Sequence, residues 1–366
     1  MTFGGKCRMA IIIFISAIVL GIVFRKSKIC TAYILIVMYI LAALKTSSAD
    51  HELYRYNYNN LAGSLGNRYA GYTMFQKFFY DMRLTFEQYN LAFYLIVLSF
   101  LVIAIRILTK NINSVLSYYM IFSYAIDVVQ MKSFIADTFS LIGIAIVIKM
   151  MSSKDRKTSM KTWAIAAICM IIAASMHFVN AFYLILIAIY LIMKNRKNIG
   201  KRMFALSVAA ILMSYSSILT IILNYGSLIG IVSNIDYLSA YITRSGRFGF
   251  LLYAVWILII IFSCRFNREH LLNNNEQSEI SIFILTSLMI IPLLMLNSEF
   301  SRLLRIYMIL LYIFYSKVER KRVIMIKNVL NYGAYAGAIA FPFFYIIGNL
   351  FEGTLESLLK YNMIFK

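Results

Sequence analysis

The sequence predicts an all-α, polytopic membrane protein, and two observations carry that prediction. Hydrophobic residues make up 61% of the 366 residues, whereas charged residues make up only 14%, well below the roughly 25% of soluble domains. The apolar residues also form repeated runs of about 16 to 23 residues, long enough to cross a hydrocarbon core as helices. We therefore expect about 12 transmembrane helices, arranged as a single integral membrane domain over residues 1–366.

Each predicted span is an apolar run bounded by short polar or charged connectors. The spans cover residues 9–24, 29–44, 90–108, 114–131, 133–150, 162–176, 178–193, 203–223, 248–264, 280–297, 303–316 and 328–350. Basic residues end the first run at Arg25, without the small-residue cleavage pattern of a signal peptide, so we expect an uncleaved span. Pro292 and Pro342 lie within late spans and predict kinks there.

The basic residues give these spans an orientation. Connectors that alternate along the chain hold 22 of the 36 Lys and Arg residues, and the positive-inside rule makes them cytoplasmic. These connectors lie at 25–28, 106–110, 149–161, 194–202, 265–268 and 317–327. The segment 45–89 and both ends of the sequence are then expected on the outer side of the cytoplasmic membrane.

Residues 45–89 form the longest stretch that is too polar for a lipid core, yet it is rich in aromatic residues. Its apolar side chains at helical spacing are Tyr72, Phe75, Phe78, Phe79 and Met82, and the polar ones opposite are Gln76, Lys77, Asp81 and Arg83. This pattern predicts an amphipathic helix in the interface plane. A plain connector is the alternative interpretation.

Two pairs of arginines lie on the outer side, against the usual topological bias. Arg302 and Arg305 are three residues apart at the start of a span, and Arg244 and Arg247 repeat that spacing in the loop 224–248. Such side chains either snorkel to lipid headgroups or face an aqueous cavity inside the bundle. Because there are two pairs beside the 45–89 segment, we favour a shared anionic site, where guanidinium groups suit phosphate and diphosphate.

A few other polar residues lie in or between apolar runs. Asp127, Gln130 and Asp137 flank a break near Lys132, and they would line one face if that region were a continuous helix. His177 lies between two spans, where a lone histidine is more often a packed or hydrogen-bonded residue than a catalyst. The four cysteines lack metal-ligand spacing and are interpreted as apolar filler.

The motifs that carry soluble-enzyme chemistry are missing from the sequence. It has no Walker loop, GxSxG, HExxH or paired CxxC motif. The formal net charge of +21 lies in connectors between spans rather than in a nucleic-acid-binding patch, so we expect no nucleic acid partner. We predict no cofactor and no protein metal site, although a divalent metal that accompanies a diphosphate substrate stays compatible with the sequence.

The order of several short motifs resembles the EpsG-like branch of Wzy-type polysaccharide polymerases. In that family a basic residue leads to an Asp-x-x-x-Tyr signature after the second span, and a Gly-aromatic element, a basic turn, a His element and a Phe-x-Arg-Leu element follow. Their counterparts here are Lys45, Asp50 to Tyr54, Gly71-Tyr72, Gln130 to Ala136, Ala174 to Phe178 and Phe300 to Leu303. Lys132 stands where the family usually has arginine, and no acidic residue precedes Gly71.

The resemblance implies a reaction at the outer membrane face. A glycan on undecaprenyl diphosphate is transferred to a sugar hydroxyl of an incoming lipid-linked repeat unit, without a nucleotide sugar. The implied base or orienting residues are Asp50, Glu52 and His177, with Asp50 as the first choice. The implied substrate- and diphosphate-binding residues are Lys45, Tyr54, Arg55, Lys132, Arg244, Arg247, Arg302 and Arg305. Expected partners are membrane lipid, a flippase and a chain-length regulator.

Two other functions compete with this one. A flippase or transporter of lipid-linked oligosaccharide would share the spans and the inward charges, but it would tend to show internal repeats and interrupted helices at mid-membrane. A membrane acyltransferase would need a histidine-centred element, for which His177 is thin support.

Overall fold

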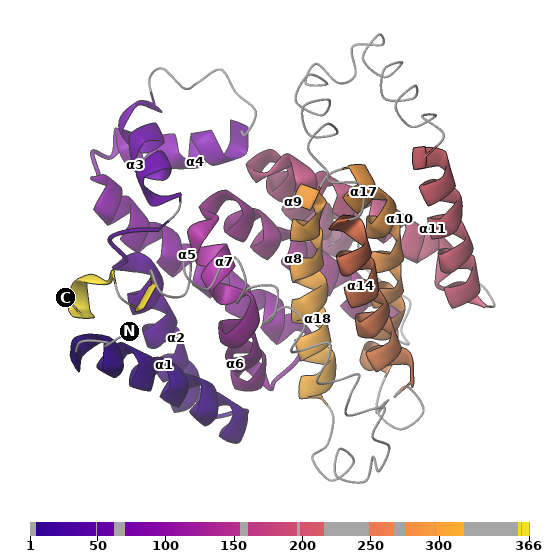
Figure 1. Cartoon of the computed structure of the whole chain (residues 1–366), viewed down its shortest axis with the longest axis horizontal. Coiled ribbons are helices and arrows are strands. Elements are labelled where there is room, and N and C mark those ends of the chain that lie inside the picture. The colour runs from indigo at the N-terminus through magenta and orange to yellow at the C-terminus, as the bar shows by residue number, and fades with distance from the viewer. Residues whose placement is uncertain are drawn as a thin grey trace.

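The computed structural model is built of helices, which confirms the predicted all-α class (Figure 1). It describes residues 5–48, 50–61, 70–153, 160–195, 198–215, 249–266, 275–296, 298–317, 358–359 and 361–365. Within these ranges there is no β-strand, and the extended pairing is limited to one isolated antiparallel bridge between Lys45 and Asn362.

Among the described residues, three helical runs are long and apolar enough to cross a membrane, namely α5 (Phe86–Leu108), α8 (Met131–Ser152) and the run Asn275–Met295. Shorter helices cover most of the other predicted spans. They are α1 (Gly5–Val23), α2 (Lys28–Ala43), α6 (Ile112–Phe122), α7 (Tyr124–Val129), α9 (Met160–Met176), α10 (Phe182–Met193), α11 (Ile199–Tyr215), α14 (Gly249–Phe266) and α18 (Leu304–Ser316). The predicted span 328–350 lies outside the described residues. The chain therefore has the helices of a membrane protein, and the total of about 12 spans stays a prediction.

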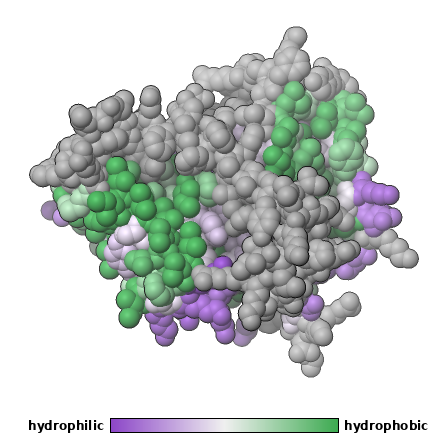
Figure 2. Space-filling model, turned by 60° about the horizontal axis from the view of Figure 1, so that its bottom comes forward, coloured by the Kyte–Doolittle hydropathy of each residue, from purple (hydrophilic) through white to green (hydrophobic). Residues whose placement is uncertain are grey.

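The outer surface of the bundle is apolar where a bilayer would touch it. On α1 the exposed residues Ile12, Ile15 and Val19 follow one face of the helix, and on α9 Ile165, Ile168 and Ile171 do the same. Figure 2 shows two broad hydrophobic patches with hydrophilic side chains gathered at their edges. Apolar residues outside and polar contacts inside are the arrangement expected of helices packed in lipid.

Local sequence signals explain where several helices begin. Thr85 and Gln88 form a reciprocal capping box at the start of α5, in which each side chain bonds the other residue's backbone N–H. Pro292 lies in the first turn of α17 (Ile290–Leu296), directly after the 3₁₀ helix η3 (Leu285–Met289). Because proline lacks an N–H, it begins a helix more easily than it continues one. The helix type changes three residues before Pro292, the predicted kink there stays a prediction, and Pro342 lies outside the described residues.

The outer segment contains two helices, α3 (His51–Asn59) and α4 (Ala70–Asp81), which lie across one end of the bundle (Figure 1). A helix over residues 72–82 was predicted, but its buried face is different. Tyr72, Gln76 and Phe79 are buried against the protein, while Phe78 and Met82 are exposed. The prediction of one apolar face was wrong because the polar Gln76 is buried beside Tyr72 and Phe79, whereas the apolar Phe78 faces outward.

A cluster of tyrosines joins α3 and α4 to α5. The rings of Tyr58 and Tyr89 are stacked with centroids 4.8 Å apart, and the Tyr89 hydroxyl donates to the Tyr72 hydroxyl at 3.2 Å. Phe75 lies edge-on to Tyr89 at 6.4 Å. Such aromatic pairs each add about 0.5–1.5 kcal/mol beyond their buried area. This cluster explains why a polar outer segment carries so many aromatic residues.

The last described residues return to the outer segment. Thr46 donates its backbone N–H to the carbonyl of Tyr361 at 2.6 Å, and Met363 donates to the carbonyl of Leu44 at 2.9 Å. The Asn362 side chain donates to the carbonyl of Ile40 at 2.9 Å and reaches that of Leu41 at 3.4 Å, both in the last turn of α2. Residues 361–363 therefore fix the chain just before the 45–89 segment leaves the bundle.

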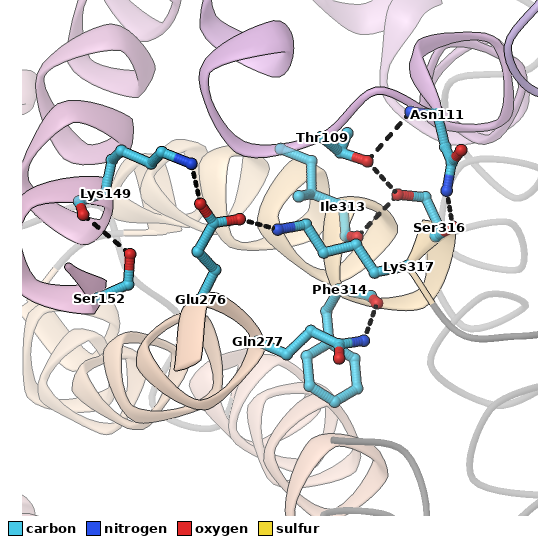
Figure 3. A network of polar contacts seen from close by, with 10 residues as sticks. All are labelled: Thr109, Asn111, Lys149, Ser152, Glu276, Gln277, Ile313, Phe314, Ser316 and Lys317. Atoms are coloured by element: carbon cyan, nitrogen blue, oxygen red, sulfur yellow. Dashed lines mark hydrogen bonds and ion pairs between the residues drawn. The ribbon is translucent and has the colours of Figure 1, made fainter. Parts of the chain in front are cut away.

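A second polar network ties helices together at the opposite end (Figure 3). Glu276, at the start of the run Asn275–Met295, bonds both Lys149 of α8 and Lys317 after α18. An acidic residue at a helix start and lysines at helix ends each favour the local helix dipole. The Thr109 and Ser316 hydroxyls, 3.2 Å apart, add a contact between α5 and α18. These residues belong to the connectors that we interpret as cytoplasmic, so this network fixes the end remote from α3 and α4.

Candidate functional site

The central feature of the candidate site is Arg305, which binds two residues at the end of a short helix. Its Nη1 donates to Asp127 Oδ1 at 2.8 Å and its Nη2 donates to Gln130 Oε1 at 2.5 Å. The Arg305 and Asp127 side chains are only 12% and 2% exposed. The guanidinium therefore points into the bundle rather than toward lipid headgroups, and its charge is paired in a place that excludes water.

A break in the backbone makes this arrangement possible. The predicted continuous span 114–131 is instead divided into α6 and α7, and a second break at Gln130 separates α7 from α8. Asp127 and Gln130 consequently lie at the end of α7, where both reach the same guanidinium. The Tyr119 hydroxyl donates to the other Asp127 oxygen at 2.7 Å, which fixes the carboxylate from the opposite side.

Lys45 holds the same helix end from the outer segment. Its Nζ donates to the carbonyl oxygen of Val128 at 2.5 Å and to the hydroxyl of Tyr94 at 2.6 Å. An ammonium at the C-terminus of a helix satisfies orphan carbonyls and the negative end of the dipole. Lys45 is 3% exposed, and its ammonium is directed at acceptors within the protein. It therefore positions the helix end that carries Asp127, and its predicted contact with diphosphate stays a prediction.

Burial lowers the pKa of Lys45 from 10.5 to about 7, and the charge of Asp50 acts in the opposite direction. Because the folded-state pKa is below the unfolded one, the folded protein binds fewer protons between about pH 7 and 10.5. The contribution of Lys45 to the free energy of unfolding should therefore rise with pH in this window. Below about pH 7 that contribution should not change with pH.

We expect the wild-type free energy of unfolding, measured relative to Lys45→Met, to rise by about 2 kcal/mol between about pH 7 and about pH 9. Chemical unfolding in detergent micelles at the two pH values checks this. Lys77→Met is the matched control, because Lys77 is half exposed beside Asp81 and should show no such difference. An equal pH dependence of both variants would mean that burial does not lower the pKa of Lys45.

Arg302 lies one turn before Arg305, in the 3₁₀ helix η4 (Ser298–Leu303), and it contacts His177. The distance from Arg302 Nη1 to His177 Nε2 is 3.1 Å. A guanidinium can only donate, so Nε2 accepts the hydrogen bond and is unprotonated. Burial, followed by the charge of Arg302, lowers the pKa of His177 well below 6.5. His177 is thus a neutral residue that orients Arg302, and its Nε2 lone pair is already used.

Lys132 connects these arginines to the outer segment. Its ammonium lies 5.9 Å from the centre of the Tyr54 ring on α3, and it is within electrostatic range of Arg302 and Asp50. Lys132, Arg302 and Arg305 all act electrostatically on His177. Three cations from α8, η4 and α18 therefore converge at the end of the bundle covered by α3. We call Lys132, His177, Arg302, Arg305 and Asp127 the cationic cluster.

Asp50, the first-choice base, lies at the start of α3. It is partly exposed, and its side chain makes no capping hydrogen bond to the helix that it precedes. It lies within electrostatic range of both Lys45 and Lys132. The structure therefore places Asp50 at the edge of the cationic cluster. Its carboxylate accepts no hydrogen bond from the backbone N–H groups in the first turn of α3.

Asp137 was noticed in the sequence but not assigned to the site. Its Oδ1 accepts from Asn180 Nδ2 at 2.8 Å, and the same amide reaches Ser140 Oγ at 3.0 Å. The other oxygen of Asp137 is buried without a hydrogen bond in the described part of the chain. Among the neighbouring cations, Arg305 compensates the Asp137 charge most, followed by Arg302. The sequence signal that could have placed Asp137 in the site is Asn180, three residues after His177. A buried carboxylate needs a hydrogen-bond donor, and the Asn180 amide supplies one.

Other predicted site residues lie elsewhere. Arg55 forms an exposed ion pair with Glu87 at 2.5 Å, and Glu52 is exposed on α3. An exposed ion pair of this kind is worth only about 0.2–1 kcal/mol. Arg244, Arg247 and the loop 224–248 lie outside the described residues. Of the predicted binding residues, the structure brings Lys132, Tyr54, Arg302 and Arg305 toward one region.

Two of the motifs that carried the resemblance meet in space. A Cβ added to Gly71 would lie 2.2 Å from the Ser175 side chain and 2.9 Å from its backbone carbon. Only glycine allows α4 to approach α9 so closely at this point. Ser175 lies two residues before His177, so the Gly71 contact holds α4 beside the cationic cluster.

No group of three or more His, Cys, Asp or Glu is placed to hold a metal ion within the described ranges. The arrangement offers instead fixed positive charge, a neutral histidine and two buried carboxylates. Such a set can bind an anion and stabilise developing negative charge without a resident cofactor. The chain has no significant match among protein-family models, curated proteins or solved structures.

Proposed function

We propose that the protein is a polysaccharide polymerase, a glycosyltransferase that uses polyprenyl-diphosphate-linked glycans at the outer face of the cytoplasmic membrane. The observation that carries this proposal is the convergence of Lys132, Arg302 and Arg305 beside the start of the outer segment. Cations that are held inside the bundle suit a diphosphate ligand better than snorkelling arginines would. The motif order described above supports the same function.

The proposed step transfers one glycan and releases one lipid diphosphate. A sugar hydroxyl of the incoming repeat unit attacks the anomeric carbon of the donor glycan, and the bond from that carbon to the diphosphate oxygen breaks. The departing diphosphate keeps the electron pair, and the guanidinium of Arg302 offsets its charge. The hydroxyl proton passes to a carboxylate, for which Asp50 is the candidate because its side chain is partly exposed beside Lys132.

Each residue of the cationic cluster has a role in this proposal. Arg302 contacts the diphosphate and is oriented by His177 Nε2. Arg305 is held by Asp127 and Gln130, so it supplies a fixed positive charge rather than a mobile one. Preorganised charge of this kind costs no rearrangement during the reaction. Tyr54 is 6% exposed and its ring lies 5.9 Å from the Lys132 ammonium, so in this proposal it positions Lys132.

Deleting the gene and examining lipid-linked glycans tests this function against the flippase alternative. Loss of a polymerase should leave single lipid-linked repeat units exposed on the outer face, without long chains. Loss of a flippase should retain the same units on the cytoplasmic face, which an impermeant sugar-modifying reagent distinguishes in intact cells. Units trapped inside, or long chains of normal length, would refute the proposed function.

A further inference from the structure

The α4 helix presents three rows of side chains to three different surroundings. Tyr72, Gln76 and Phe79 pack against the protein. A second row, at every fourth position, consists of Met74, Phe78 and Met82. Their exposed fractions are 69%, 60% and 57%. The Met82 backbone N–H still bonds the carbonyl of Phe78 at 3.4 Å, so Met82 continues the row just beyond the helix.

The third row is charged and lies directly beside the apolar one. Lys77 and Asp81 form an exposed ion pair at 3.4 Å along the helix. Each precedes a residue of the apolar row by one position, which is a rotation of about 100° around the helix. The exposed side of α4 therefore changes from apolar to charged across its width, as expected of a helix at a boundary between lipid and water.

The helices beneath α4 show where that boundary lies. α4 packs on α5 and α9, whose apolar side chains face outward at Leu95 and Ile171, with exposed fractions of 60% and 63%. These are the side chains of spans in contact with lipid. Three side chains are also too few for a stable protein partner, which needs roughly 800 Å² on each side.

We propose that Met74, Phe78 and Met82 insert at the headgroup–acyl boundary of the leaflet on the α4 side, while Lys77 and Asp81 stay in water. The bilayer then covers the apolar row. The tight contact of Gly71 with Ser175 fixes α4 against α9 two residues before His177. This inference depends on the placement of α4 alone and holds whatever reaction the protein catalyses.

Lipid quenching of tryptophan fluorescence tests the inference. The two native tryptophans, Trp163 and Trp256, are first replaced by phenylalanine, and a single tryptophan is introduced as Phe78→Trp or, separately, Met74→Trp. Lys77→Trp is the matched control from the adjacent row. Each full-length variant is reconstituted in phosphatidylcholine nanodiscs, with or without bromine near the top of the acyl chains, after its helical content is shown to match wild type.

We expect bromolipid to quench the fluorescence at positions 78 and 74, with little loss at position 77. Quenching at position 77 equal to that at position 78 would overturn the inference, since α4 would then be submerged. Unquenched fluorescence at positions 78 and 74 would overturn it too. In that case, accessibility to acrylamide would mean that the row faces water, and protection from acrylamide would mean that a protein covers it.

Discussion

Replacing Arg305 with alanine is expected to lower the free energy of unfolding by about 3–5 kcal/mol, because the variant strands a buried carboxylate. Asp127 is 2% exposed, and Arg305 is the cation that contacts it. The Tyr119 hydroxyl, which donates to its other oxygen, cannot compensate a full negative charge in a place without water. Reversible unfolding in mixed micelles, followed by circular dichroism, measures the loss.

The double variant Arg305→Ala/Asp127→Asn separates this structural cost from function. Removing the stranded charge should recover most of the lost stability, because an amide without its partner costs far less than a carboxylate. Chain extension should remain impaired, since the fixed positive charge is still missing. Wild-type stability of the single variant, or normal polymer from the double variant, would contradict the role assigned to this pair.

Replacing Arg302 with alanine is expected to abolish chain extension while the protein still accumulates in the membrane. One of its partners is the neutral His177, and the substitution strands no charge of opposite sign on that residue. Loss of one preorganised group that stabilises a departing anion costs about 10²–10³ in rate. Polymer length on gels, with membrane abundance measured in the same samples, checks both halves of the prediction.

Two further variants define what Arg302 supplies. Arg302→Lys keeps the charge but lacks the planar fork, so it should restore only a small part of the activity. Arg83→Gly is the matched control, because Arg83 is exposed on the outer segment and has a left-handed φ of 59° that glycine adopts without strain. Long polymer from Arg302→Ala, at a level equal to that of Arg83→Gly, would remove Arg302 from the site.

Much of the fold could be predicted from apolar run length. A span needs an unbroken apolar run, so the positions of α2, α5 and α8 follow from the sequence within a few residues. The break at Gln130 lies within two residues of the one predicted near Lys132. The break at Ser123 could not be predicted, because it contains no glycine or proline and depends on tertiary contacts. The 3₁₀ segment η4, which carries Arg302, was missed for the same reason.

The site was partly predictable, and its errors have one physical cause. Charged or polar residues in or near an apolar run indicate a polar interior of the bundle. Asp127, Gln130 and Arg305 were identified in the sequence for this reason. Their pairing joins residues 178 and 175 positions apart, a distance that no local pattern encodes. The bond from Lys45 to the Val128 carbonyl could not be predicted either, because a lysine at the end of a span looks the same whether it faces a ligand or a backbone carbonyl.

The most direct test of the central claim is a reconstitution with the purified full chain. Liposomes receive a polyprenyl-diphosphate-linked repeat unit as the sole glycan, without any nucleotide sugar, and the products are followed by mass spectrometry. We predict lipid-linked oligomers of increasing length, with one polyprenyl diphosphate released for each new linkage, and neither product from Arg302→Ala. Movement of the repeat unit across the bilayer with no new glycosidic bond would contradict the claim.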